Sequence, residues 1–83
     1  MKITIKLFAL LAKYLPEDAY RNVAEIDVAD GATVHDVVQQ LKLPCEHCHL
    51  VMVDGVYIAP SERDERVLKS GEALAIWPPV AGG

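Results

Sequence analysis

The stretch TVHDVVQQL, residues 33–41, determines the fold of this chain. Thr33 can cap a helix, and Asp36, three residues later, can return the hydrogen bond, which is a signature of a helix start. Four apolar side chains then recur at helical spacing: Val34, Val37, Val38 and Leu41. We predict a helix from Val34 to Leu41 whose valine stripe another element must cover.

The segments on either side of this helix have the patterns of β-strands. Apolar and polar side chains alternate in KITIKLF (2–8) and again between residues 23 and 28, as in a strand with one buried face. HLVMVDGVYIA (49–59) predicts a β-hairpin, because Asp54-Gly55 supplies the positive φ angles of a tight turn. EALAIW (72–77) predicts the last strand.

Two further segments complete the reading of local structure. ALLAKYL (9–15) is rich in helix formers and is followed by Pro16, so we expect a short helix there. PSERDER (60–66) carries both charge signs, and we expect a solvated polar loop. The order of elements predicts an α+β fold, a mixed sheet with one main helix packed across it. We expect one domain over residues 1–77 and an extended tail over residues 78–83.

Composition excludes several classes of protein. The 83-residue chain is 52% hydrophobic, which is typical of a folded domain, and its net charge is −4. The eight Lys and Arg residues are scattered, which argues against nucleic-acid binding and suits a partner with a basic face. The uninterrupted apolar run near the N-terminus, residues 7–12, is too short for a signal peptide or a membrane span. With only two cysteines, close together, we expect a cytoplasmic protein.

The closing stretch WPPVAGG (77–83) combines two prolines with side chains that diminish to glycine. Pro78 and Pro79 lack backbone N–H donors and favour extended backbone, so sheet pairing should stop there. The side chains then diminish from Val80 through Ala81 to Gly82 and Gly83. A chain of that shape can thread a narrow channel and bring a terminal carboxylate to a buried reagent, where an unhindered glycine carbonyl suits acyl transfer.

The whole chain resembles the ThiS/MoaD family of bacterial sulfur carriers, within which its tail is similar to that of the small subunit of molybdopterin synthase. The similarity is carried by KITIKLFALLAKYL, GATVHDVVQQL, LVMVDGVYI and VLKSGEALAIWPPVAGG. It implies a ubiquitin-like β-grasp. Pro-Pro-Val-Ala-Gly-Gly is its most specific part, because plain Gly-Gly also ends other carriers.

The resemblance implies a carrier cycle. An adenylating enzyme that uses ATP would activate the Gly83 carboxylate, and a persulfide donor would convert it to a thiocarboxylate. The tail would then enter the large subunit of molybdopterin synthase and donate sulfur to cyclic pyranopterin monophosphate, for the dithiolene of the molybdenum cofactor. No cofactor would be bound permanently. The residues expected to contact partners are Trp77, Pro78, Pro79, Val80, Ala81 and Gly82. Trp77 could equally be a core residue, since Trp serves both environments.

The stretch CEHCH (45–49) does not fit this family. Cys45 and Cys48 have the spacing of half a zinc site, and His47 and His49 add nitrogen ligands, but these five residues can hardly form a closed four-ligand site. We interpret the stretch first as an incidental polar loop and assign no metal. A metal shared between two copies, and redox or sulfur-relay chemistry, stay open. We expect His35 to be a solvated helix residue.

No recognisable set of catalytic residues is present, so we expect the chain alone to catalyse nothing. Three alternatives to the molybdopterin carrier remain. The chain could carry sulfur for thiamine, cysteine or tungsten-cofactor assembly. It could be a ubiquitin-like modifier that joins target lysines through Gly83. It could also be a plain binding module with an inert tail.

Overall fold

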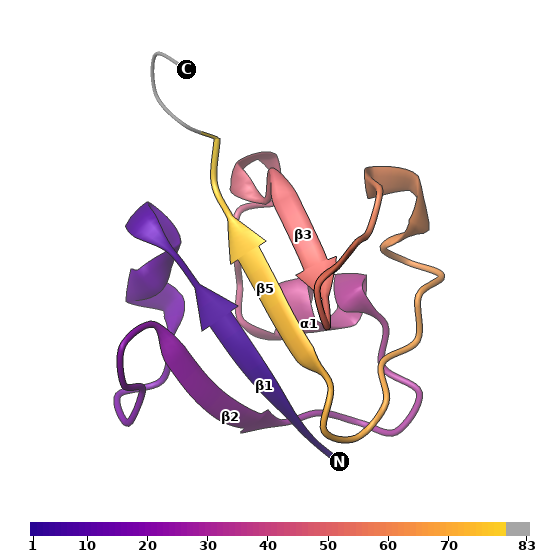
Figure 1. The fold of residues 1–83 in the computed structure, drawn as a ribbon, viewed down its shortest axis with the longest axis horizontal. Helices are drawn as coiled ribbons and strands as arrows, with labels where there is room; N and C mark the ends of the chain where they lie inside the picture. Colours follow the sequence, from indigo (N-terminus) through magenta and orange to yellow (C-terminus); the bar gives the residue numbers. More distant parts are fainter. Residues whose placement is uncertain (80–83) are drawn as a thin grey trace.

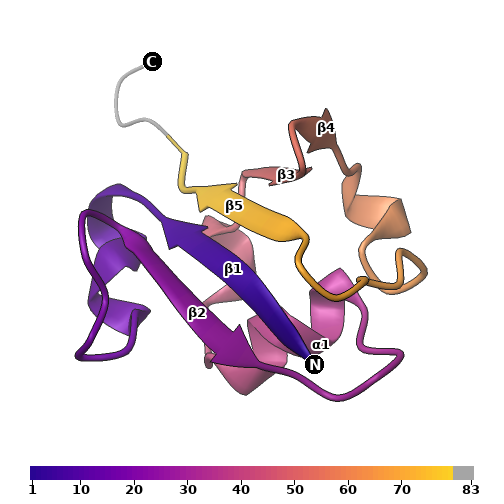
Figure 2. The ribbon, with the colours of Figure 1, turned by 60° about the horizontal axis from the view of Figure 1, so that its bottom comes forward.

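The helix predicted from residues 33–41 lies across a five-stranded sheet. The computed structural model describes residues 1–79. Figures 1 and 2 show the strands side by side with α1 behind them, on one face. The elements in chain order are β1 (Lys2–Leu7), η1 (Ala9–Tyr14), β2 (Val23–Asp27), α1 (Val34–Gln40), η2 (Cys45–His47), β3 (Leu50–Val53), β4 (Val56–Tyr57), η3 (Pro60–Glu62) and β5 (Ala73–Trp77), where η denotes a 3₁₀ helix.

The last strand, β5, occupies the middle of the sheet, whose order is β2-β1-β5-β3-β4. β1 and β5 are parallel, with Ile5 opposite Leu74, whereas β3 runs antiparallel to β5, with Val51 opposite Ile76. The expected α+β class, with a mixed sheet and one main helix, is confirmed. A strand paired on both sides is held firmly along its length, so β5 is a rigid support for whatever follows it.

The predicted start of α1 is confirmed in detail. The Thr33 backbone N–H donates to the Asp36 carboxylate at 3.0 Å, and the Asp36 N–H donates to the Thr33 hydroxyl at 3.1 Å. Val34, Val37 and Val38 are buried, as their spacing predicts. Leu41 is the half-buried C-cap, so the helix ends one residue earlier than expected, within the usual uncertainty of a helix end.

The core lies between α1 and the sheet. The side chains with less than 2% exposure are Ile3, Ile5, Leu7, Leu11, Val34, Val37, Val51, Val53, Leu74 and Ile76. Burying one such side chain contributes about 1.5–3 kcal/mol to the free energy of unfolding. Because β1 and β5 supply half of this set, the two parallel strands are the best-anchored part of the sheet.

The predicted hairpin is confirmed between β3 and β4. Asp54 and Gly55 have φ angles of 49° and 82°, as a tight two-residue turn requires. Asp54 also fixes the start of β5, because its carboxylate accepts from the Ala73 N–H at 2.8 Å and its own N–H donates to the Ala73 carbonyl at 2.9 Å.

The short helix expected at residues 9–15 is a 3₁₀ helix that ends at Tyr14. Phe8 precedes it in an extended conformation and gives no side-chain cap, and Leu15 is again extended before Pro16. An uncapped segment this short is too brief for a stable α-helix. Ala9 has a φ of 53°, an uncommon value for a residue other than glycine, at the sharp change of direction after β1.

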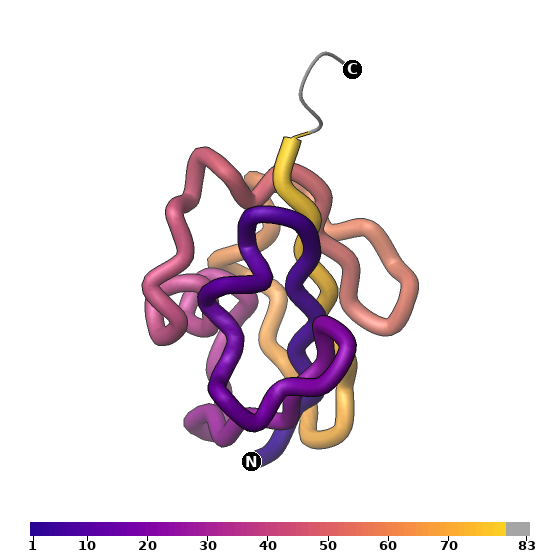
Figure 3. Tube along the Cα trace, turned by 90° about the vertical axis from the view of Figure 1, so that its left-hand side faces the viewer, coloured from indigo at the N-terminus to yellow at the C-terminus, as the bar shows by residue number. Residues whose placement is uncertain are grey.

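The two ends of the described chain lie at opposite ends of the molecule (Figures 1 and 3). Met1 is beside the start of β1, and Pro79 lies beyond the end of β5. Within residues 1–79, no helix has the length and apolar character needed to cross a membrane.

Candidate functional site

The pairing of β5 stops at Trp77, as the sequence predicts. Trp77 lies opposite Leu50, and its carbonyl accepts from the His49 N–H at 3.0 Å. Pro78 and Pro79 follow without N–H groups and extend neither edge of the strand. Pro78 is nevertheless buried, whereas Pro79 is exposed. The chain therefore leaves the surface of the body between the two prolines.

Trp77 is held by a neighbour that the sequence did not single out. Its indole stacks on the Phe8 ring, with centroids 4.5 Å apart and planes inclined by 7°. Trp77 is half-buried, so part of its side chain packs against the body and part stays accessible. Stacked aromatic rings bury area and fix orientation together. The last residue of β5 therefore has a defined position at the surface.

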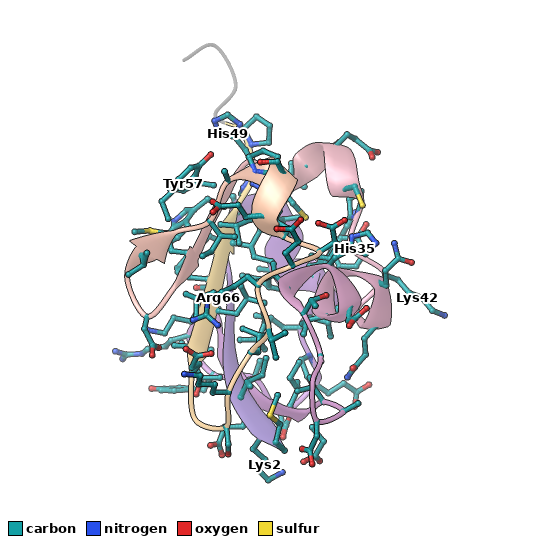
Figure 4. The ribbon with its side chains drawn as sticks, turned by 90° about the vertical axis from the view of Figure 1, so that its right-hand side faces the viewer. Lys2, His35, Lys42, His49, Tyr57 and Arg66 are labelled. Carbon is teal, nitrogen blue, oxygen red and sulfur yellow. The ribbon has the colours of Figure 1, made fainter. Side chains whose placement is uncertain are left out.

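An apolar hollow of about 440 Å³ adjoins the point where the chain leaves the body. We call it the exit groove; it is lined by Ala9, Leu10, His49, Leu50, Trp77, Pro78 and Pro79. Leu10 is 47% exposed, so it presents apolar surface at this groove. His49 is the one ionisable side chain among the lining residues, and Figure 4 shows it at this end of the molecule. An apolar surface of this kind suits contact with another protein.

A second hollow, of about 320 Å³, lies on the sheet face opposite α1. Lys6, Met52, Asp54 and Ala75 line it together with the Phe8–Trp77 pair. Trp77 thus contributes to both hollows.

The remaining predicted site residues, Val80, Ala81, Gly82 and Gly83, lie outside the described residues. Their roles stay predictions. Of the expected contact residues, the structure brings together Trp77, Pro78 and Pro79 at the exit groove. It adds Leu10 to the groove and Phe8 beneath Trp77, two residues far from residues 77–79 in the sequence, so no local pattern could reveal either contact.

Arg63 holds the backbone next to the exit groove. Its guanidinium donates to the Cys48 carbonyl at 2.7 Å and to the His49 carbonyl at 3.1 Å. The His49 N–H in turn bonds Trp77, so Arg63 supports the backbone that pairs with the end of β5. The expectation of a wholly solvated loop at residues 60–66 is therefore wrong at Arg63, which is half-buried.

Arg66 is a second exception in that loop. Its guanidinium forms an ion pair with the Glu72 carboxylate at 2.7 Å (Nη2 to Oε2), just before β5. The hydrogen bond from Arg66 lowers the pKa of Glu72, and the Lys69 N–H, which donates to the same carboxylate at 2.7 Å, acts in the same direction. The sequence offered no sign of this contact beyond the opposite charges.

The two cysteines of residues 45–49 differ in environment. Cys45 begins η2 and is exposed, whereas Cys48 is 5% exposed and packs in the core. Burial raises the pKa of the Cys48 thiol, and the neighbouring Cys45 raises it further. Among residues 1–79 no group of three or more His, Cys, Asp or Glu side chains is arranged to hold a metal ion. His49 lines the exit groove, whereas Cys45 and Cys48 line a different hollow.

Comparison with known proteins identifies relatives of the whole chain. The model of the ThiS family matches residues 5–83. No curated protein matches the sequence. Among solved structures, SAMP1 from Haloferax volcanii is similar, with a TM-score of 0.69 and 25% identity, over 100% of both chains.

Two further solved structures also match over 100% of both chains. The thiamine biosynthesis protein ThiS from Geobacter metallireducens has a TM-score of 0.67 and 18% identity. The complex of subunits 1 and 2 of molybdopterin-converting factor from Helicobacter pylori has a TM-score of 0.60 and 20% identity. At these identities the two likenesses concern the fold.

Proposed function

The chain belongs to the ThiS family and has a ubiquitin-like β-grasp fold, and from these premises we propose that it carries sulfur to the molybdopterin dithiolene as a thiocarboxylate on Gly83. The observation that carries the proposal is the end of β5. There a doubly paired strand stops at a stacked Trp77 and two prolines, beside an apolar groove. A protein that delivers a group on its C-terminal residue needs a rigid strand from which the extended segment starts, and an apolar surface beside it that binds the acceptor protein.

The proposed arm is residues 78–83. Because Pro78 is buried, the free part is residues 79–83, which reach about 17 Å when fully extended, enough to place Gly83 inside a partner while the exit groove stays at its surface. With Gly83 as the terminal residue, its carboxylate attacks the α-phosphate of ATP in an adenylating enzyme, which gives an acyl adenylate and pyrophosphate. The outer sulfur of a persulfide RSS⁻ then displaces AMP and forms an acyl disulfide, and a second thiol attacks the RS sulfur, which releases the thiocarboxylate and leaves a disulfide on the donor. The chain itself supplies the acyl group and its position, and the partner supplies the catalysts.

The proposed acceptor is the large subunit of molybdopterin synthase. A solved structure of similar fold is a complex of subunits 1 and 2 of molybdopterin-converting factor, which supports a two-subunit assembly. The exit groove would be the apolar centre of that contact, with Trp77 as its largest side chain and the exposed Leu10 beside it. The net charge of −4 favours a basic rim on the partner.

A second candidate is a protein modifier. SAMP1 from Haloferax volcanii, 25% identical to this chain, also appears as small archaeal modifier protein 1 in a structure with 26% identity. The same activated Gly83 could acylate a lysine amine in place of accepting sulfur. Sulfur carriage for thiamine, cysteine or tungsten-cofactor assembly uses the same first step and differs in the acceptor.

The first test is an intact-mass spectrum after incubation with ATP, the adenylating enzyme of the host, a persulfide source and a thiol reductant. We expect a gain of about 16 Da at Gly83, since sulfur replaces one oxygen. Deletion of Gly82 and Gly83 should abolish the gain. A known carrier that the same enzyme converts serves as the positive control; if it gains sulfur and this chain does not, the carrier proposal is wrong.

The second test assigns the acceptor. The thiocarboxylated chain is mixed with the large synthase subunit and cyclic pyranopterin monophosphate, and the mass of the chain is followed. Return to the carboxylate with formation of a dithiolene pterin supports the molybdopterin assignment. If the chain keeps its sulfur in the presence of the large subunit and the pterin, the molybdopterin assignment is wrong. Conjugates of the chain with lysine residues of other proteins in lysates would favour the modifier.

A further inference from the structure

The two cysteines form a pair whose geometry the proposed carrier function does not use. Cys45 begins the 3₁₀ helix η2 and Cys48 is its C-cap, joined by a hydrogen bond from the Cys48 N–H to the Cys45 carbonyl at 3.1 Å. In a 3₁₀ helix the side chains of residues i and i+3 lie one above the other. The two thiols therefore share one side of the turn.

Cys45 and Cys48 both line one hollow of about 300 Å³ between α1, η2 and η3, although only Cys45 is exposed. His35, Pro60, Arg63 and Asp64 are among the residues that line it. His35 projects from α1, as Figure 4 shows, and is exposed as expected. The hollow is large enough for part of a small organic molecule, and its opposite charges at Arg63 and Asp64 leave it without a strong overall sign.

The two thiols are unequal in accessibility. Cys45 is exposed, so a reagent in the hollow reaches it directly. Cys48 is 5% exposed, and its thiol lies 3.5 Å from the Pro44 carbonyl, to which it donates. Burial raises the pKa of Cys48, and the position of its side chain in the core shields it from outside reagents. An exposed first thiol and a protected second thiol are the parts of a stepwise exchange.

We propose that Cys45 and Cys48 form a reactive dithiol that exchanges with small disulfides in this hollow. The Cys45 thiolate attacks one sulfur of a disulfide RSSR, forming a mixed disulfide and releasing one thiolate. The Cys48 thiol loses its proton and attacks the Cys45 sulfur, releasing the second RS⁻, which takes up a proton. The protein is oxidised by two electrons to the Cys45–Cys48 disulfide, and RSSR is reduced to two thiols. This chemistry is separate from Gly83.

The test uses the full, reduced chain and oxidised glutathione. Intact mass is recorded before and after alkylation of the remaining thiols. For the wild type we expect a loss of about 2 Da, no thiol left to alkylate and no stable glutathione adduct, since ring closure removes two hydrogens. A mass twice that of the chain, or a lasting mixed disulfide, overturns the proposal, as do two thiols that stay free.

Two matched variants separate the roles of the thiols. Cys48→Ala should trap glutathione on Cys45 with a gain of about 305 Da, because nothing remains to displace it. Cys45→Ala should react about tenfold more slowly than the wild type, because its remaining thiol is buried. Equal rates in Cys45→Ala and the wild type would overturn the order of the two steps. If Cys48→Ala fails to fold by circular dichroism, the wild-type mass change still decides the proposal.

Discussion

The Trp77 indole lies flat on the Phe8 ring, with centroids 4.5 Å apart and an angle of 7° between the planes. Phe8 follows β1 and Trp77 ends β5, so the stack joins the ends of two parallel strands. It fixes the last paired residue at the point where residues 78–83 begin. The position from which the proposed arm starts is therefore set by a contact between residues near opposite ends of the sequence.

The stack should couple the stabilities of the two aromatic residues. Phe8→Ala, Trp77→Ala and the double variant are compared by urea unfolding. We expect the double variant to lose about 1 kcal/mol less than the sum of the single losses, because stacked rings contribute roughly that much beyond buried area. Additive losses would mean that the rings stabilise the protein independently.

Leu10 should contribute to partner binding. Leu10→Ala should weaken binding to the large synthase subunit or the adenylating enzyme by about tenfold, as loss of an apolar anchor does, with little change in stability. Val67→Ala is the matched control, because Val67 is also 47% exposed and does not line the exit groove. Calorimetry gives both affinities. Equal effects of the two changes would exclude the exit groove as the contact.

Arg63 should stabilise the backbone before β3. Arg63→Ala removes both donors to the Cys48 and His49 carbonyls, and we expect a loss of about 1–3 kcal/mol in the free energy of unfolding. Faster hydrogen exchange of the His49 amide should accompany it. Glu65→Ala, an exposed residue in the same loop, should change stability by less than about 0.5 kcal/mol. If hydrogen exchange at His49 stays unchanged, Arg63 does not stabilise the backbone that pairs with the end of β5.

Glu72 should make stability depend on pH. Its pKa is lowered in the folded state, chiefly by the hydrogen bond from Arg66. Its contribution is therefore fully present above the unfolded pKa of about 4.3 and is lost as pH falls through the folded value. Glu72→Gln should cost about 1 kcal/mol at neutral pH, and the difference from wild type should shrink at acid pH. A gap that stays constant with pH would contradict an ionic contribution.

The capping box of α1 should contribute measurably to the free energy of unfolding. Thr33→Ala removes the hydroxyl that accepts the Asp36 N–H and should cost about 1 kcal/mol in thermal or urea unfolding. Thr33→Ser keeps an acceptor and should cost much less. If the two variants lose equal stability, the hydroxyl of Thr33 does not account for its contribution.

Much of the fold could be predicted because its signals are local. The Thr33–Asp36 cap, the valine spacing of α1 and the Asp54-Gly55 turn each depend on residues a few positions apart, and all are confirmed. The proline stop after Trp77 is equally local, since it follows from missing N–H groups. The Cys45–Cys48 spacing was visible as well, although the burial that makes the two thiols unequal was not.

The sequence by itself determined the main helix, the strands, their order and the composition of residues 77–83, because propensity, periodicity and turn chemistry act over a few bonds. Only the tertiary structure decided which distant residues meet. It set the Phe8 ring on Trp77, the Arg63 guanidinium on the carbonyls of Cys48 and His49, and Leu10 beside Pro79. Such contacts depend on how the strands pair and on how the whole core packs, and no local pattern in the chain records them.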